Sequence, residues 1–146
     1  MSVGLLDVNV LVALFDPAHI NHDEAHEWFG ASRKRGWATC TITVNGCVRV
    51  LSSPGYRSVE ATPADVIGHL RELCKLPGHV SWEGSVSLLD PGLFRPEFIG
   101  GHRKVTDAWL LGLAVKHGGK LVTFDRGIPV RAVAGARAEH LELLGG

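Results

Sequence analysis

The stretch KVTDAWLLGLAVKHGGKLVTF, residues 104–124, contains two patterns that together decide the fold class. Its first part is rich in leucine, alanine and valine, and the pair Gly118-Gly119 closes it, which predicts a helix. The part that follows, KLVTF, has the branched and aromatic residues of a strand and runs up to Asp125. A helix that leads directly into a buried strand is typical of α/β proteins with a parallel sheet.

The same alternation fills the N-terminal third of the chain. In VGLLDVNVLVALF, residues 3–7 read as a buried strand and the remainder as the opening of a helix. Asn21, followed three residues later by Glu24, predicts the capping-box start of a second helix, with basic residues 33–35 in its last turn. Gly36 would end that helix. WATCTIT then predicts a strand over 37–43, and VNGCVRVLS a helix over 44–52.

The rest of the chain continues the pattern. TPADVIGHLRELCKLPG predicts a helix with Thr62 at its cap, HVSW a short strand, and HLELL a last strand. Residues 85–101 predict only a short helix and a loop. Strands that alternate with helices throughout indicate a three-layer α/β/α fold with a central, mostly parallel sheet. No linker or repeat divides the sequence, so residues 1–146 are expected to form a single domain.

Composition narrows the class of protein. The 146 residues are 45% hydrophobic and 21% charged, as in globular chains, and the formal net charge is zero. A nucleic-acid partner would therefore need a local basic patch. The three cysteines, Cys40, Cys47 and Cys74, form no CxxC pair and read as reduced thiols. No leader and no apolar run of the ~20 residues that a membrane span needs is visible, which predicts a cytoplasmic protein.

Three carboxylates lie where burial would be costly. Asp7 and Asp125 each follow a predicted buried strand, and the carboxyl ends of parallel strands meet at one edge of a sheet. Asp107 shares a helix face with the apolar residues three, four and seven positions on. Carboxylates gathered in this way repel one another unless a cation lies between them. Oxygen ligands without Cys or His favour a hard metal, Mg²⁺ or Mn²⁺, which could assist attack on a phosphodiester.

Each carboxylate also has a simpler interpretation. Asp7 could cap the following helix, Asp107 could interact with its own helix dipole, and Asp125 could belong to an ordinary turn. Other functions fit the sequence less well. The histidines at 19, 22 and 26 suit an exposed polar face better than a zinc site. The residues of aspartyl-phosphate enzymes are incomplete, and no GxGxxG follows the first strand.

Four motifs in order resemble the PIN domains, and more closely the VapC-type ribonuclease toxins of bacterial toxin–antitoxin pairs. They are LLDVNVLVALFD, ATCTITVNGCVRVLS, GHRKVTDAWLLGLAVKHGGKLVTFDRGI and HLELL. The resemblance covers essentially the whole chain. It implies a cytoplasmic, Mg²⁺-dependent endoribonuclease that forms a homodimer and is neutralised by a VapB antitoxin.

The resemblance also implies roles for individual residues. Asp7 and Asp107 would be direct metal ligands, and Asp125 a further acidic member that acts directly or through water. Asn9 and Thr123 would be polar supports near the metal.

Basic residues near these motifs are candidates for contact with RNA phosphates. They are Arg49, Arg103 with its neighbour Lys104, and Arg126. Alternatively, these side chains are solvated, balance the acidic cluster, or pair with carboxylates of the antitoxin.

Val44 departs from the pattern of similar toxins. There the helix opens with Thr-Glu-Asn-Gly, and the glutamate joins the acidic cluster, whereas this chain has TVNG. Val44 forms an apolar stripe with Cys47, Val48 and Leu51, so valine suits the helix. The loss of one carboxylate predicts weakened RNA cleavage. The alternative is a catalytically impaired PIN homologue that retains only antitoxin binding and dimerisation.

Overall fold

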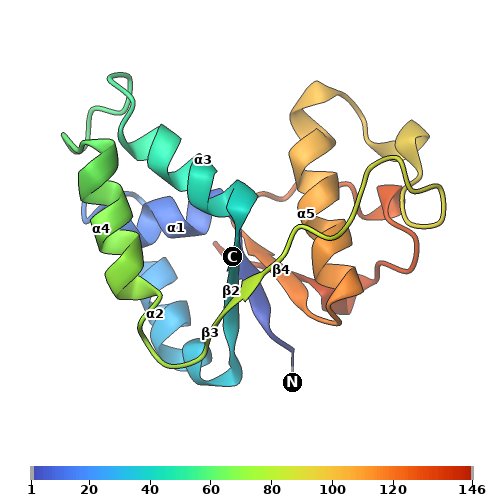
Figure 1. The fold of residues 1–146 in the computed structure, drawn as a ribbon, viewed down its shortest axis with the longest axis horizontal. Coiled ribbons are helices and arrows are strands. Elements are labelled where there is room, and N and C mark those ends of the chain that lie inside the picture. The colour runs from blue at the N-terminus through green and yellow to red at the C-terminus, as the bar shows by residue number, and fades with distance from the viewer. Residues whose placement is uncertain (1, 146) are drawn as a thin grey trace.

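Five short parallel strands form the centre of the protein, as the computed structural model of the chain shows (Figure 1). The structure describes residues 2–145. In the sheet the strands have the order β3-β2-β1-β4-β5. Their bounds are β1 Gly4–Leu6, β2 Trp37–Cys40, β3 His79–Trp82, β4 Lys120–Thr123 and β5 Leu141–Leu143. Every strand pair is parallel, which confirms the predicted sheet.

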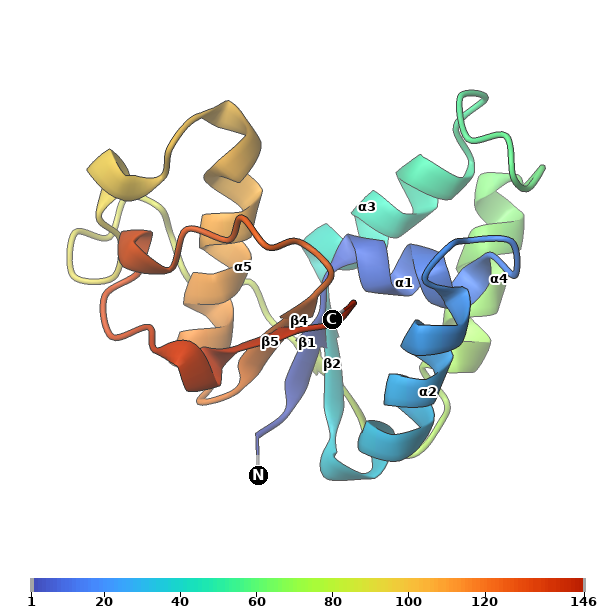
Figure 2. The ribbon, with the colours of Figure 1, turned by 180° about the vertical axis from the view of Figure 1, so that it is seen from behind.

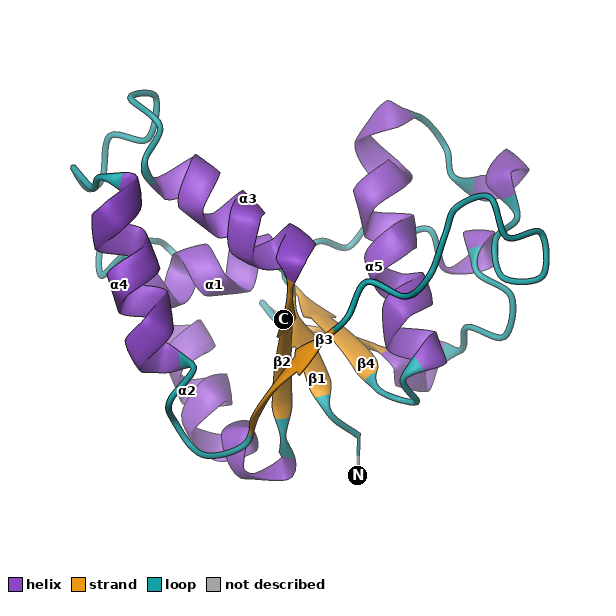
Figure 3. Cartoon of the chain, in the orientation of Figure 1, coloured by secondary structure: helices purple, strands orange, loops and turns teal. Residues whose placement is uncertain are grey.

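Helices cover both faces of this sheet, so the predicted three layers are confirmed (Figures 2 and 3). Four helices lie on one side and one on the other. The first group is α1 Val8–Phe15, α2 His22–Ser32, α3 Thr41–Leu51 and α4 Pro63–Leu73, and the opposite helix is α5 Val105–Lys116. Short 3₁₀ turns complete the fold at Arg33–Arg35, Pro96–Phe98, His102–Lys104, Val130–Ala132 and Ala138–His140.

The alternation of side chains along each strand builds two separate cores. Leu6 and Val122 point into the core beneath α1–α4, whereas Leu5 and Leu121 point into the core beneath α5. All four side chains are fully buried. Because successive strand residues face opposite sides, a central strand needs apolar residues at every position, and this explains the continuous apolar runs in the sequence.

The strand order places a topological switch point between β1 and β4. The chain proceeds from β1 outward to β2 and β3, and then crosses to the other side of β1 to form β4. Leu6 pairs with Val122, so both strands end at the same level. In open α/β sheets, ligands bind in the crevice outside such a point, at the carboxyl ends of the strands. The residues that directly follow β1 and β4 are therefore the first to examine for function.

Four of the five predicted strands are shorter in the structure, and the difference is largest for β2. The strand predicted over 37–43 ends at Cys40, and α3 begins at Thr41. The hydroxyl group of Thr43 accepts a hydrogen bond from the backbone N–H of Cys40 and donates one to its carbonyl, which turns the chain out of the sheet. This local capping outweighs the strand preference of Thr41, Ile42 and Thr43. Similarly, KLVTF leaves the sheet after Thr123.

The predicted capping box at Asn21 is wrong, although α2 does begin directly after this residue. Asn21 makes no side-chain cap hydrogen bond. Glu24 instead accepts a hydrogen bond from the backbone N–H of Gly145, 2.7 Å away, and so ties α2 to the C-terminal segment. The helix α2 ends at Ser32, before the predicted stop, and Gly36, with a φ of 104°, ends the short turn that follows. Residues 33–35 form a separate 3₁₀ turn before it.

The remaining elements agree closely with the prediction. The hydroxyl of Thr62 caps α4 as expected, with Asp65 completing a capping box. Cys40 and Cys47 are buried and Cys74 is half-buried, and all three thiols are free. Within residues 2–145, no helix has both the length and the apolar character needed to cross a membrane.

Gly46 allows a close contact between α3 and α1. A Cβ atom at this position would lie 2.6 Å from Cγ2 of Val8, a stiff β-branched side chain. We expect Gly46→Ala to lower the free energy of unfolding by about 1–3 kcal/mol through overpacking between α3 and α1. Denaturant unfolding monitored by circular dichroism measures this change.

The matched control is Gly68→Ala in α4, where a Cβ would meet no atom within 4 Å. This variant should raise stability by about 0.5–1 kcal/mol, because alanine restricts the unfolded chain and favours the helix. Val8→Ala should relieve the cost of Gly46→Ala. Equal effects of the two glycine substitutions would contradict the predicted close packing.

Candidate active site

Asp7 follows β1 directly and is almost fully buried at the switch point. Its Oδ1 accepts a hydrogen bond of 2.7 Å from the backbone N–H of Val8, so Asp7 caps α1. Its Oδ2 accepts one, also of 2.7 Å, from the hydroxyl of Thr123 at the end of β4. Each carboxylate oxygen keeps a further lone pair that is free to bind another group. The helix-cap interpretation of Asp7 is thus confirmed, and it is compatible with a second role as a ligand.

Thr123 connects the ends of the two central strands. Besides donating to Asp7, its fully buried hydroxyl oxygen accepts hydrogen bonds from Nδ2 of Asn9, at 3.1 Å, and from the backbone N–H of Asp125, at 3.0 Å. Asn9 in turn accepts, through Oδ1, a hydrogen bond from the backbone N–H of Phe124. Asn9 and Thr123 therefore lie beside the carboxylates in the positions expected of polar supports, and they fix where Asp7 and Asp125 can point.

Asp125 lies two residues beyond β4 and is held by its own turn. Its Oδ1 accepts a hydrogen bond of 2.7 Å from the backbone N–H of Gly127, which is the turn geometry expected of an ordinary aspartate. Its Oδ2 faces the ammonium group of Lys104 at a distance of 3.9 Å. The turn leaves Oδ2 available to other groups, and the side chain is 37% exposed.

Asp107 is the carboxylate without a local structural role. It lies in the first turn of α5, but no side-chain cap hydrogen bond is found at this helix start. The charges of Asp7 and Asp125 both act on Asp107, so the three carboxyl groups lie near one another. Residues from β1, β4 and α5 thus meet at one place, as predicted from the sequence, and the helix-dipole interpretation alone does not explain Asp107.

The electrostatics of this cluster reflect unbalanced negative charge. Burial, followed by repulsion from Asp7 and Asp125, raises the pKa of Asp107 to about 6. Burial also raises the pKa of Asp7, although the hydrogen bonds from Thr123 and Val8 oppose this shift. Both groups are thus less acidic than an ordinary aspartate, chiefly because burial disfavours the ionised form and, to a smaller extent, because a neighbouring carboxylate repels it. A cation placed among them would remove that cost.

The donor set fits a hard divalent metal held partly through water. Among residues 2–145, no group of three or more Asp, Glu, His or Cys side chains is arranged to ligate one ion simultaneously. Mg²⁺ commonly keeps several waters and binds through one or two carboxylates. Asp7 and Asp107 offer the two most buried acidic oxygen donors of the cluster, and Asp125 could contribute through a bridging water. The residues present therefore suit Mg²⁺ or Mn²⁺ and no thiolate-binding metal.

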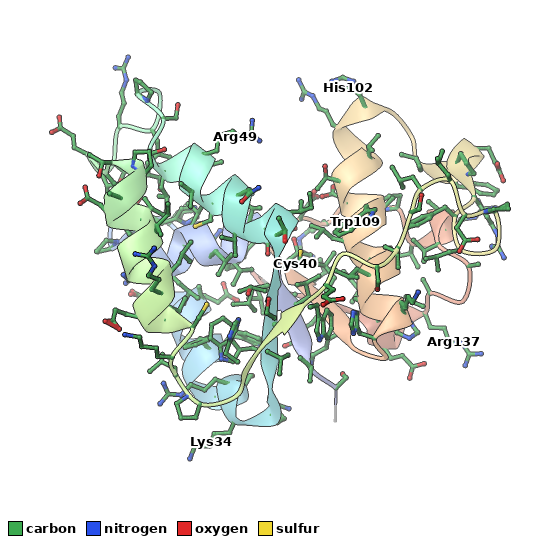
Figure 4. The ribbon with its side chains drawn as sticks, viewed as in Figure 1. Lys34, Cys40, Arg49, His102, Trp109 and Arg137 are labelled. Atoms are coloured by element: carbon green, nitrogen blue, oxygen red, sulfur yellow. The ribbon has the colours of Figure 1, made fainter. Side chains whose placement is uncertain are left out.

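The predicted basic residues are not equally close to this cluster. The guanidinium of Arg126 donates to the carbonyl oxygen of Gly145 and is thereby held against the C-terminal segment. Arg49 on α3 and Arg103 before α5 are exposed. Figure 4 shows Arg49 and His102, the residue before Arg103, at the upper end of the molecule, and Lys34 at the opposite end. Only Lys104 among these side chains forms an ion pair with a cluster carboxylate in the described part of the chain.

Val44 lies in the first turns of α3 and packs as the apolar stripe predicts. It contacts the core beneath α1–α4 and lines a shallow apolar groove together with Ile67 and Leu70 of α4. Cys47 and Leu51, which continue the stripe, are fully buried. Valine is therefore compatible with the packing at this position, and it adds no oxygen donor to the site.

Neither of the nearest candidates in the sequence, Asp16 and Glu60, replaces the expected glutamate within residues 2–145. Asp16 lies at the far end of α1, about 14 Å along the helix from Asp7. Its two oxygens accept hydrogen bonds from Tyr56, Ser58 and the backbone of Ala18. Glu60 belongs to the surface loop between α3 and α4.

The predicted exposed histidine face has a structural function that the sequence did not reveal. His22 and His26 hydrogen-bond the carbonyl oxygens of Ala13 and Leu14 at the end of α1, at 2.7 and 2.9 Å. They therefore satisfy carbonyl groups that a helix end leaves without partners. Their ring nitrogens point to backbone and not to a common metal position.

A parallel α/β/α sheet with carboxylates at this switch point defines the PIN-domain class of proteins. The PIN domain family matches residues 4–134, and the chain belongs to this family. Within it, the similar proteins are VapC ribonucleases of Mycobacterium tuberculosis. Ribonuclease VapC44 is 44% identical over 141 residues, which cover 97% of this chain and 99% of that protein.

Further relatives agree with this assignment. Ribonuclease VapC39 from the same organism is 42% identical over 132 residues, covering 90% of this chain and 95% of that protein. Among solved structures, the crystal structure of M. tuberculosis VapC20, described as a sarcin-ricin loop cleaving toxin, superimposes with a TM-score of 0.56. It covers 80% of this chain and 85% of that one at 12% identity, so this likeness concerns the fold alone.

The raised pKa of Asp107 predicts a pH-dependent response to metal. We expect Mg²⁺ to raise the Tm of the protein at about pH 8 and to have little effect at about pH 5, because below its pKa of about 6 Asp107 holds a proton that the ion must displace. Thermal unfolding with and without Mg²⁺ measures this. The same Tm increase at both pH values would contradict the proposed ligand.

The free energy of unfolding of the metal-free protein should also depend on pH through Asp107. A carboxyl group whose pKa is raised by folding costs stability as the pH rises through that value. Asp107→Asn should therefore stabilise the metal-free protein above about pH 6, by about 1 kcal/mol after screening of this half-buried group, and have no effect near pH 3. Asp23→Asn on the exposed surface of α2 is the control and should change little at either pH.

Proposed function

We propose that the chain is the toxin of a type II toxin–antitoxin system and acts as a metal-dependent endoribonuclease. The observation that carries this proposal is the meeting of Asp7, Asp107 and Asp125 at the switch point of a PIN-domain sheet, where burial, followed by repulsion from the other two carboxylates, raises the pKa of Asp107 to about 6. The 44% identity to Ribonuclease VapC44 over nearly the full length of both chains supports the substrate class.

Asp7 and Asp107 would hold Mg²⁺, with Mn²⁺ as a substitute, and Asp125 would contribute through a water molecule. When bound, the ion supplies charge that offsets the developing negative charge on a phosphodiester and lowers the pKa of a bound water. Thr123 and Asn9 keep the carboxylate of Asp7 in one orientation. Asp125, whose Oδ2 is not used by its turn, is suited to orient the attacking water.

RNA would approach over the carboxyl edge of the sheet. Arg49, which lies near this end of the molecule in Figure 4, and Arg103, which directly precedes Lys104, are exposed and are candidates for contact with RNA phosphates. Arg126 would first have to leave the carbonyl of Gly145. Both RNA and a VapB-type antitoxin are cytoplasmic molecules in bacteria, so the proposed site of action is the cytoplasm.

The proposed homodimer has support from an apolar surface. Ile42 at the start of α3 and Val105 at the start of α5 are 43% and 38% exposed. Together with Leu88 and Trp109 they line one shallow apolar groove. Exposed apolar side chains that gather in this way are typical of surfaces that are covered by another chain.

The proposed cleavage should depend on the two metal ligands. We expect Asp7→Asn and Asp107→Asn each to lower the kcat/KM for RNA cleavage by about 10³-fold, because each removes a charged oxygen donor. Cleavage of single-stranded RNA with Mg²⁺, Mn²⁺ or a chelator measures the effect. Asp90→Asn in an exposed turn should cleave like the unchanged chain. Metal-independent cleavage would contradict this mechanism.

We further propose that Val44 makes this chain a slow enzyme. Val44→Glu should raise kcat/KM by about tenfold or more, since a carboxylate on a flexible arm can add a ligand or orient water. Val48→Glu, one turn later on the same side of α3, is the matched control and should give no gain. Equal activity of Val44→Glu and the unchanged chain would contradict this part of the proposal.

The alternative is a homologue that retains antitoxin binding and dimerisation without cleavage. The apolar packing of Val44 favours it, because the position serves the core and not the site. One experiment distinguishes the active ribonuclease from this non-cleaving homologue. A chain that binds Mg²⁺ and antitoxin but cleaves no RNA, with activity appearing in Val44→Glu, would establish the alternative.

A further inference from the structure

We propose that Lys104 binds substrate, a role that rests on the ribonuclease function proposed above. Its ammonium group would contact a non-bridging oxygen of the scissile phosphodiester and offset the negative charge that one divalent ion leaves on the three carboxylates. Lys104 is the residue immediately before α5, three positions from Asp107.

The first observation is that Lys104 reaches into the acidic cluster. Its Nζ lies 3.9 Å from Oδ2 of Asp125, and its side chain is 34% exposed. Its positive charge also lowers the pKa of Asp107, opposite to the effect of the neighbouring carboxylates. One cation thus acts on two of the three cluster members while one side of it stays open to solvent.

The second observation concerns Gly127, which leaves room for the end of the Lys104 side chain because it has no Cβ atom. A Cβ atom on Gly127 would lie 2.3 Å from Nζ of Lys104 and 3.4 Å from its Cε, so any larger residue at 127 would displace the ammonium group. Gly127 has no left-handed backbone conformation that would otherwise require glycine. The space above the Asp125 turn is therefore filled by the end of Lys104.

The third observation is that the contact is loose. At 3.9 Å the ammonium and the carboxylate attract each other without a hydrogen bond, and no hydrogen bond from Nζ to any of residues 2–145 is found. An ammonium group carries three donors, so Lys104 can accept an anionic ligand without breaking a strong interaction. A half-exposed pair of this kind contributes little to stability, which leaves the lysine free to move.

Charge balance explains why such a cation is needed. Three ionised carboxylates and one divalent ion leave a single negative charge, which would repel a phosphodiester. Lys104 offsets that charge at the point where the substrate must enter. The same reasoning predicts that, without RNA, the ammonium group competes with the metal for the carboxylates.

The test compares Lys104→Met, Lys104→Arg and Lys34→Met, a control that removes a charge from an exposed position at the opposite end of the molecule. Binding of a fluorescein-labelled single-stranded oligoribonucleotide is measured with Ca²⁺ in place of Mg²⁺, over a range of salt concentrations. Lys104→Met should bind about tenfold more weakly, with a salt slope lower by about 0.7. Lys104→Arg should retain most of the affinity, and Lys34→Met should match the unchanged chain.

Titration with Mg²⁺ alone supplies a second readout. Lys104→Met should bind the ion about threefold more tightly than the unchanged chain, because a competing positive charge is gone. Gly127→Ala keeps the charge but displaces it, so it should weaken RNA binding as Lys104→Met does. The two substitutions combined should be no worse than either alone.

Either of two results would overturn the proposal. One is RNA affinity and salt slope in Lys104→Met equal to those of the unchanged chain. The other is equal impairment of the Met and Arg variants with unchanged Mg²⁺ affinity, which would indicate a structural role. Failure of the proposed function looks different, since the unchanged chain would then bind RNA in a Lys104-dependent manner without cleaving it in Mg²⁺.

Discussion

The hydroxyl group of Thr123 is the interaction on which the site depends. It donates to Asp7 and accepts from Asn9 and from the backbone of Asp125, so one buried oxygen joins the ends of β1 and β4 and the start of α1. It holds the carboxylate of Asp7 directly and fixes the backbone of Asp125, from which the second carboxylate extends. The remaining features of the site, from the turn of Asp125 to the charge on Asp107, follow from this fixed arrangement.

Carboxylates that lie close together destabilise the folded protein unless donors or cations offset their charge. The protein uses backbone and hydroxyl donors at Asp7, a turn N–H at Asp125, and the ammonium group of Lys104 at the open side. Asp107 has no such donor in its own helix start, and burial together with the neighbouring carboxylates raises its pKa to about 6. Under the proposed function, a bound cation would offset this charge, which links the stability of the protein to its proposed chemistry.

Much of the fold could be predicted because its signals are local. Apolar runs, glycine stops and the Thr62 cap placed most elements within a few residues of their bounds. The failures are also instructive. Strand preference in TIT was overridden by the capping hydrogen bonds of Thr43, and Glu24 left its expected cap to bind Gly145, which is far away in sequence. In both cases the side chain forms a hydrogen bond that residue preferences along the chain do not predict.

The sequence by itself determined the class of fold, the family and the three carboxylates, because apolar periodicity and motif order are properties of the chain. It also marked Val44 as the position without a carboxylate. Only the tertiary structure decided which charges meet. It brought Asp107 near Asp7 and Asp125, so that their charges act on it, turned Arg126 away to Gly145, and placed the end of Lys104 beside Gly127. These contacts depend on how β1, β4 and α5 pack, and side-chain reach across such packing cannot be read from spacing along the chain.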